Sequence, residues 1–143
     1  SNLVERLSRD CQTTSDTETL TAQLQQFVRD YSFIQYVYVT DVKGHSTAIA
    51  ISDPGDQKGY KAFPIGFDYS NREWFQQPMR TGKLHIMNVH QSQVTGQLII
   101  TVSTVITDAN DEIIGVLGAD IQLEEIIRRA ESLEAEEHIG EEE

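Results

Sequence analysis

The sequence predicts an α+β domain in which a run of antiparallel β-strands is flanked by helices at both ends. Apolar residues recur at helical spacing over the first part of the chain, form several short strand-like runs between residues 33 and 120, and return to helical spacing from about residue 122. Strands grouped in the middle of a chain are typical of α+β proteins, because parallel sheets alternate strands with helices. The 143 residues suffice for one such domain with its own core.

The N-terminal part, residues 1–31, is expected to form two helices. The first covers residues 3–12, and Ser15 followed by Glu18 fits a capping box that would begin the second. The apolar residues at helical spacing are Leu3, Val4, Leu7 and Cys11 in the first helix, and Leu20, Leu24, Phe27, Val28 and Tyr31 in the second.

Residues 32–121 are expected to form the core of the domain. Aromatic and β-branched residues over 33–40 predict a first strand, and residues 45–51 predict its hairpin partner. Residues 52–66 are rich in Pro, Gly and Asp and predict a long loop. A loop of this length in a compact domain is often functional.

A short helix over 70–81 and three further strands over 84–90, 97–107 and 112–120 complete this core. Residues 97–107 alternate clearly between two faces, one apolar and one that mixes hydroxyls with aliphatics. We therefore expect a five-stranded antiparallel sheet with a pocket beneath the loop and short helix. The face towards the helices would carry Leu98, Ile100, Val102, Thr104 and Ile106, and the pocket wall Ile99, Thr101, Ser103, Val105 and Thr107.

The formal charge of −12 is concentrated in the C-terminal segment, 122–143, which is predicted as a connector helix and acidic tail. Residues 121–143 hold nine acids and two bases, a net −7, and the rest of the chain carries −5. This balance argues against a nucleic-acid binder or an anchor to anionic lipid. The helix would pack on the domain or on a dimer partner through Leu123, Ile126, Ile127, Ala130 and Leu133.

Motifs of enzymes and metal sites are absent from the sequence, which contains no GxSxG, HExxH, GxxxxGK[ST] or GxGxxG. Cys11, the single cysteine, is expected in a helix core. His85 and His90 lie five apart on one predicted strand, so they are expected to face opposite sides and to be unable to share a metal. Residues 108–112 lack the glycine and distal glutamate of a calcium loop. We predict no catalytic residue, no metal and no cofactor.

Residues 68–75, with the sequence DYSNREWF, place Arg72 and Trp74 two residues apart after the long loop. An arginine guanidinium offers paired donors to a carboxylate. An indole adds one N–H donor and a flat apolar wall. The pair therefore predicts a carboxylate-binding site, with a surface arginine beside a core tryptophan as the alternative.

These residues resemble Cache (PDC) sensor domains, single-module type. The resemblance covers roughly 33–128 and is carried by D-x-S-x-R-x-W-F at 68–75, T-G at 95–96 followed by IITVS, and IIGVLGADI at 113–121. Such domains are the PAS-like sensory parts of bacterial chemoreceptors, sensor histidine kinases and diguanylate cyclases. The resemblance implies an antiparallel sheet that binds a small molecule under a loop–helix cover.

In relatives that bind amino acids, the R-x-W pair holds the ligand carboxylate, which implies this role for Arg72 and Trp74. The aspartate of the G-A-D-I block holds the amine in those relatives, and Asp120 occupies that position here. Asp120 could instead cap the helix that begins at 122. The remaining polar wall of the expected site is formed by Tyr38, Thr101 and Ser103.

Three positions depart from the family pattern. A tyrosine and an aspartate expected before the T-G turn are His90 and Ser92, and a tyrosine expected five residues before the arginine is Phe67. Loss of a carboxylate near an ammonium removes a bond of about 1.5–3 kcal/mol. A protonated histidine would repel a cation. The departures therefore favour a small organic or hydroxy acid over a standard α-amino acid.

The resemblance leaves several alternatives open for the whole protein. The leading interpretation is a small-molecule sensor, and the alternatives are an interaction or dimerisation module with no ligand and an amino-acid sensor with an altered amine site. A homodimer through helices and an output domain, in the same protein or a separate one, are the expected partners. The family location is extracytoplasmic, as part of a membrane receptor, and the acidic C-terminal stretch favours a soluble cytoplasmic sensor as the alternative.

Overall fold

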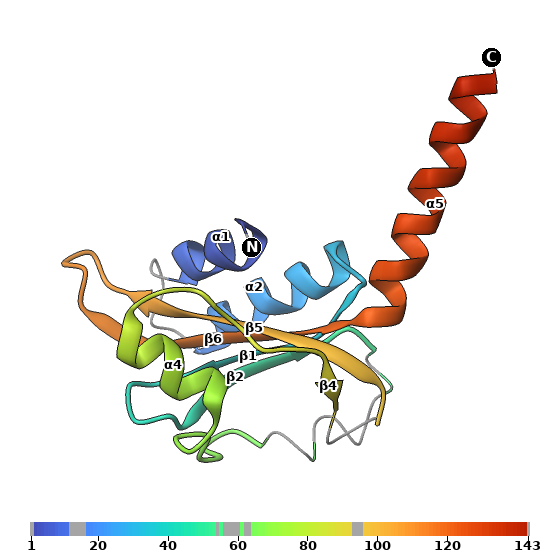
Figure 1. Cartoon of the computed structure of the whole chain (residues 1–143). Coiled ribbons are helices and arrows are strands. Elements are labelled where there is room, and N and C mark those ends of the chain that lie inside the picture. Colours follow the sequence, from blue (N-terminus) through green and yellow to red (C-terminus); the bar gives the residue numbers. More distant parts are fainter. Residues whose placement is uncertain are drawn as a thin grey trace.

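The computed structural model describes residues 2–11, 17–53, 55, 61, 64–92 and 96–142. Helices α1 and α2 cover one face of a β-sheet, α4 covers the other, and α5 extends away from the body (Figure 1). The helices are α1 (Asn2–Cys11), α2 (Thr17–Asp30), α4 (Glu73–Thr81) and α5 (Leu123–Glu142). The strands are β1 (Ile34–Thr40), β2 (Ser46–Ile51), β3 (His85–Ile86), β4 (His90–Gln91), β5 (Leu98–Thr107) and β6 (Ile113–Gln122).

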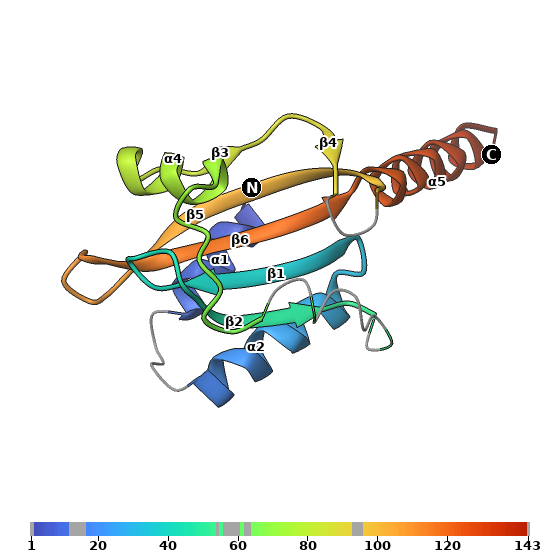
Figure 2. The same cartoon turned by 90° about the horizontal axis from the view of Figure 1, so that it is seen from below.

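The sheet is antiparallel and has the order β2-β1-β6-β5-β3, with β4 also paired to β5. Figure 2 shows β2, β1, β6 and β5 side by side, with α2 crossing behind β2. The predicted α+β class is confirmed, and the predicted hairpin over 33–51 is β1 and β2.

The main hydrophobic core lies between the sheet and the two N-terminal helices. Val102 and Ile106, on the expected helix-facing side of β5, are 4% and 3% exposed and pack in this core with Val4, Leu24 and Leu117. Alternation along a strand places every second side chain on one face. The opposite face of the same strands is therefore available for a pocket.

The predicted strand over 84–90 is divided into β3 and β4. His85 and Ile86 pair with Ser103 and Val102, while His90 pairs with Ile99. Three residues thus separate Ile86 from His90, but only two separate their partners. One extra residue forms a β-bulge and reverses the alternation of side chains. The expectation that His85 and His90 face opposite sides is therefore wrong, because both lie on the pocket face of the sheet.

The boundary between β6 and α5 also differs from the prediction. The strand continues to Gln122, whose N–H donates to the Phe33 carbonyl at 3.0 Å, and the helix begins at Leu123. Asp120 is thus an interior strand residue, and its predicted role as a helix cap is wrong. On α5, Ile127 and Leu133 are 49% and 62% exposed, so they do not pack on the domain.

Some predictions fall outside the described residues: Ser15 of the capping box, most of the loop over 52–66, Thr95, and the side chains of Cys11 and Ile126. Within the described ranges, none of the helices is both long and apolar enough to cross a bilayer.

Replacement of Gly115 by alanine is expected to destabilise the sheet. A methyl group at this position would overlap the backbone carbonyl of Thr40 on the neighbouring strand, which cannot move without disrupting β1. Such overpacking costs about 1–3 kcal/mol, a fall of roughly 3–10 °C in melting temperature for a domain of this size. Thermal unfolding followed by circular dichroism tests this, with Ile114→Ala at an exposed neighbouring position as the control. Equal melting temperatures for the Gly115 variant and the unmodified chain would contradict the prediction.

Candidate functional site

A cavity of about 510 Å³ lies on the sheet face opposite α1 and α2, beneath α4 and the segment that precedes it. It is lined by side chains from β1, β4, β5 and β6 as well as the α4 segment: Tyr38, Phe67, Tyr69, Asn71, Arg72, Glu73, Trp74, Met87, His90, Gln91, Ser92, Ile99, Thr101 and Asp120. Residues that are far apart in the sequence therefore meet at one site.

All of the predicted ligand-binding residues except Ser103 line this cavity. Ser103 faces the same side of the sheet, but it is fully buried opposite Gly118 on β6. Its hydroxyl makes no hydrogen bond within the described part of the chain. The sequence prediction thus placed Ser103 on the correct face but too far along β5 to reach the cavity.

The start of α4 holds Arg72 and Trp74 in place. Arg72 is the N-cap residue in extended conformation, its N–H donates to the Tyr69 carbonyl at 2.9 Å, and its own carbonyl accepts from Gln76 N at 2.9 Å. The Arg72 side chain is half-buried, and Trp74, two residues later, is 8% exposed. Arg72 therefore lines the cavity from a fixed backbone position, next to Trp74.

Three aromatic rings form this wall. The ring of Tyr38 lies 4.7 Å from Trp74 and 6.2 Å from Tyr69, measured between centroids, and Tyr69 lies 5.2 Å from Trp74. Burial raises the pKa of Tyr69 to about 12, and the positive charge of the nearby Arg72 opposes part of this rise. Tyr69 is therefore a neutral phenol at physiological pH. Phe67 is 40% exposed and packs on Tyr69 at the rim.

Sequence reasoning missed Tyr69, which is 3% exposed. The family pattern directs attention to position 67, five residues before the arginine, and Phe67 stands there. The alternation of side chains from 67 to 69 was the available signal, because it places both residues on one side of an extended segment. The other lining residues that the sequence analysis missed are Asn71, Glu73, Met87, Gln91 and Ile99.

Asp120 supplies a second polar group of the lining, besides Arg72, and we call the regions around Arg72 and Asp120 the first and second poles of the cavity. The Tyr38 hydroxyl donates to Asp120 Oδ1 at 2.5 Å, and the Thr101 hydroxyl donates to the same oxygen at 2.9 Å. Burial raises the pKa of the Asp120 carboxyl, while these two hydrogen bonds and the nearby His90 oppose that rise. Gly118 makes the geometry possible, since a methyl group there would overlap the Tyr38 ring.

His90 joins this pole through Thr101. Its Nε2 lies 3.3 Å from Thr101 Oγ1, and its Nδ1 lies 2.8 Å from the Asn88 carbonyl oxygen. The β-bulge between β3 and β4 turns the imidazole towards the cavity, so this contact was not predictable from simple alternation.

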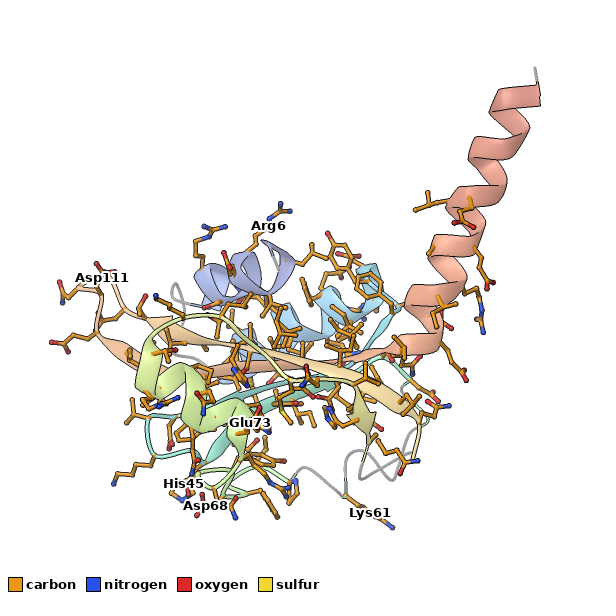
Figure 3. All side chains as sticks on the ribbon, in the orientation of Figure 1. Arg6, His45, Lys61, Asp68, Glu73 and Asp111 are labelled. Carbon is orange, nitrogen blue, oxygen red and sulfur yellow. The ribbon has the colours of Figure 1, made fainter. Side chains whose placement is uncertain are left out.

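A contact between helix and sheet also fixes the start of α4. His85 Nε2 and Glu73 Oε2 are 2.7 Å apart, which ties the first residue of α4 (Glu73, labelled in Figure 3) to the edge strand β3. Among the described residues, no group of three histidine, cysteine or acidic side chains could hold a metal ion.

Replacement of Asp120 by asparagine is expected to raise the melting temperature of the ligand-free protein by a few degrees at about pH 7. Burial raises the folded-state pKa of Asp120, so ionisation costs more in the folded than in the unfolded chain. That cost is present at neutral pH and is lost as the pH falls and the carboxyl is protonated in both states. Asparagine retains an oxygen that accepts from Tyr38 and Thr101, and it carries no charge.

The difference in melting temperature should therefore close between neutral pH and about pH 3. Differential scanning calorimetry across this range measures it, with Asp111→Asn in an exposed turn as the control. A variant that is less stable than the unmodified chain at neutral pH would show that the ionised carboxylate is stabilised overall by its donors.

The pattern of one family matches residues 17–128: methyl-accepting chemotaxis protein-like, first PDC sensor domain. Among curated proteins, the chain is 23% identical over 134 residues to methyl-accepting chemotaxis protein McpA of Pseudomonas putida, covering 92% of this chain and 19% of that protein. It is 41% identical over 108 residues to Citrate (Re)-synthase of Syntrophus aciditrophicus, covering 76% of this chain and 17% of that protein. This partial match does not establish enzymatic activity.

Two solved structures show the same fold. The ligand-binding domain of Pseudomonas fluorescens chemoreceptor CtaA, in complex with L-serine, has a TM-score of 0.66 and 25% identity, with 88% of this chain and 51% of that chain covered. The ligand-binding domain of Campylobacter jejuni chemoreceptor Tlp3, in complex with L-valine, has a TM-score of 0.67 and 19% identity. The match covers 87% of this chain and 51% of that chain. The chain therefore spans about half the length of these structures and less than a fifth of the curated relatives.

Proposed function

The chain belongs to the family of methyl-accepting chemotaxis protein-like first PDC sensor domains, and on that premise we propose that it binds a small carboxylate-bearing molecule through Arg72 and Trp74 for bacterial signal transduction. The observation that supports this most directly is the cavity of about 510 Å³, whose lining includes both Arg72 and the buried carboxyl of Asp120. A few polar groups in an aromatic-walled cavity are typical of a site that fixes the orientation of a small ligand.

The chemistry of each pole supports a carboxylic acid. The Arg72 guanidinium can donate two parallel hydrogen bonds to one carboxylate, and Trp74 lies beside it as an apolar wall. At the other pole, Asp120 can accept from a ligand O–H or N–H group. Among the described residues that line the cavity, we identify no pair of a nucleophile and a general base. We therefore propose binding without chemical turnover.

A second candidate is an amino-acid sensor. The structure of the CtaA ligand-binding domain, which is 25% identical to this chain, contains L-serine. An amino acid has both a carboxylate and a hydrogen-bond donor group. The presence of Asp120 in the cavity favours this candidate, whereas the replacement of an expected aspartate by Ser92 weakens it. A fold that serves interaction alone is disfavoured by the polar side chains in the lining of the cavity, which include Arg72 and Asp120.

We further propose that α5 connects the sensor to an output domain or separate partner, and that exposed Ile127 and Leu133 pair with a second copy of the chain. Asp120 lies on β6, and α5 follows that strand directly, so a ligand at Asp120 can shift the start of α5. We place the domain on the extracytoplasmic side of a membrane receptor, with a cytoplasmic sensor as the alternative.

A thermal-shift screen tests the proposed function. The panel contains short mono-, di- and hydroxycarboxylates, citrate and amino acids, with uncharged amides of the same acids as matched controls. A ligand at 100 times its Kd stabilises the folded state by about 2.7 kcal/mol. We expect at least one carboxylate to raise the melting temperature and to be recovered chemically unchanged. Equal effects of acid and amide, or no effect of any acid, would contradict the proposal.

A further inference from the structure

A chain of hydrogen bonds runs from the backbone to the carboxylate pole of the cavity. His90 Nδ1 lies 2.8 Å from the Asn88 carbonyl oxygen, and His90 Nε2 lies 3.3 Å from Thr101 Oγ1. Thr101 Oγ1 in turn donates to Asp120 Oδ1 at 2.9 Å, and Tyr38 donates to the same oxygen at 2.5 Å. The imidazole and the carboxylate are thus linked by a single hydroxyl group.

The number of protons in this chain determines the charge of His90. A carbonyl oxygen can only accept, so Nδ1 must carry a hydrogen to bond Asn88. Thr101 has one hydroxyl hydrogen, which it gives to Asp120, so its oxygen can only accept from His90 Nε2. When Asp120 is ionised, the complete hydrogen-bond chain has both ring nitrogens donating and therefore requires a positive charge on His90.

The remaining acceptor at this pole belongs to Asp120. Tyr38 and Thr101 both donate to Oδ1, and no described residue donates to Oδ2. Asp120 lines the cavity while only 6% of its surface is exposed. A donor on the ligand is therefore the natural partner of Oδ2.

We propose that His90 determines the specificity of this site by balancing the charge of Asp120 through Thr101, so that the second polar group of the ligand is a neutral hydroxyl, and the ligand is a 2-hydroxy acid. This inference rests on the proposed function, because it assumes that Arg72 receives the carboxylate. A hydroxyl donates to Asp120 Oδ2 and adds no charge. An ammonium in the same place adds an unbalanced positive charge close to the imidazolium, which costs about tenfold or more in affinity.

None of the other charged or titratable side chains that line the described cavity offsets the charge of Asp120 in place of His90. Arg72 is matched by the ligand carboxylate, and Glu73 is held by His85 at 2.7 Å. Tyr38 and Tyr69 have pKa values raised by burial, so both are neutral phenols at physiological pH. The remaining charged groups that face the second pole are His90, on β4, and Asp120, on β6.

Isothermal titration calorimetry on matched pairs of acids tests the inference. Each pair shares one carbon skeleton and differs only in a hydroxyl or an amine: lactate with alanine, malate with aspartate, and 2-hydroxy-3-methylbutanoate with valine. We expect the preferred skeleton to bind about tenfold more tightly as the hydroxy acid.

The variant His90→Gln provides the decisive comparison. Its amide can still donate to Thr101, but it cannot carry a charge. We expect the hydroxy-to-amino preference to fall about tenfold. His45→Gln, at a histidine outside the cavity, should leave the preference unchanged. The readout is the ratio of the affinities for the hydroxy acid and the amino acid. A variant that is damaged in folding or in binding generally loses both affinities alike, so the ratio does not change.

Three results would overturn the inference. Equal or tighter binding of the amino acid by the unmodified chain would overturn it while leaving carboxylate recognition intact. An unchanged preference in His90→Gln would show that His90 does not set the specificity. Failure of every hydroxy and amino acid to bind would overturn both this inference and the proposed function.

Discussion

Replacement of Arg72 by alanine is expected to weaken the binding of a carboxylate ligand by about 100-fold or more. A bidentate contact between a guanidinium and a carboxylate contributes about 1.5–3 kcal/mol per charged hydrogen bond, and alanine removes the charge and both donors. The backbone of Arg72 is held by its N-cap position and its bond to the Tyr69 carbonyl, so the start of α4 should persist in the variant. The Kd for the best acid of the thermal-shift panel, determined by calorimetry, measures this loss.

Two further variants separate electrostatic recognition from structural damage. Arg72→Lys retains the charge but not the planar pair of donors, and an intermediate loss of about tenfold is expected. Arg80→Ala removes an exposed arginine of the same helix that lies outside the cavity, and its Kd should match that of the unmodified chain. A large fall in the melting temperature of ligand-free Arg72→Ala would assign the arginine to folding, and an unchanged Kd would exclude it from the site.

The sequence was sufficient to predict the fold because its periodicity follows the packing. Along β5, Val102 and Ile106 face the helices while Ile99 and Thr101 face the cavity, as alternation requires. The hairpin of β1 and β2 was equally predictable, since a turn ending at Gly44 separates two β-branched runs, and Gly44 has a φ of 92°. Local sequence and tertiary structure agree in these elements.

The position of His90 could not be predicted from the sequence. No glycine or proline marks the bulge between Ile86 and His90, and the extra residue is defined only by pairing with β5. One residue of register reverses which face a side chain occupies, and it brings this imidazole to Thr101. The feature that distinguishes the site most clearly thus depends on a long-range pairing.

The role of Asp120 was left open by the sequence for a related reason. An aspartate two residues before a helix fits both a cap and a strand residue. Tertiary hydrogen bonds decide between them, because Gln122 N–H donates to the Phe33 carbonyl and extends β6 beyond Asp120. The carboxyl is then directed to Tyr38 and Thr101, across two strand pairs, instead of to the backbone of α5.

Replacement of Trp74 by alanine is expected to lower the free energy of unfolding by about 3–5 kcal/mol, which is a fall of roughly 10–20 °C in melting temperature for a chain of this length. Trp74 is 8% exposed and fills the space between Tyr38 and Tyr69, with ring centroids 4.7 and 5.2 Å away. Its removal enlarges the cavity and takes away the support of the Tyr38 ring that donates to Asp120. Stability and binding should therefore be lost together, unlike in Arg72→Ala.

Phe67→Ala is the matched control, because Phe67 is also an aromatic residue of the cavity but is 40% exposed. This substitution should lower the free energy of unfolding by less than about 1 kcal/mol. Trp74→Phe should recover most of the stability, since a ring remains between the two tyrosines. Trp74 is the single tryptophan of the chain, so its fluorescence reports on this cavity alone and gives Kd and unfolding curves for every variant that retains it. A Trp74→Ala variant as stable as Phe67→Ala would show that the aromatic wall of the cavity does not support the fold.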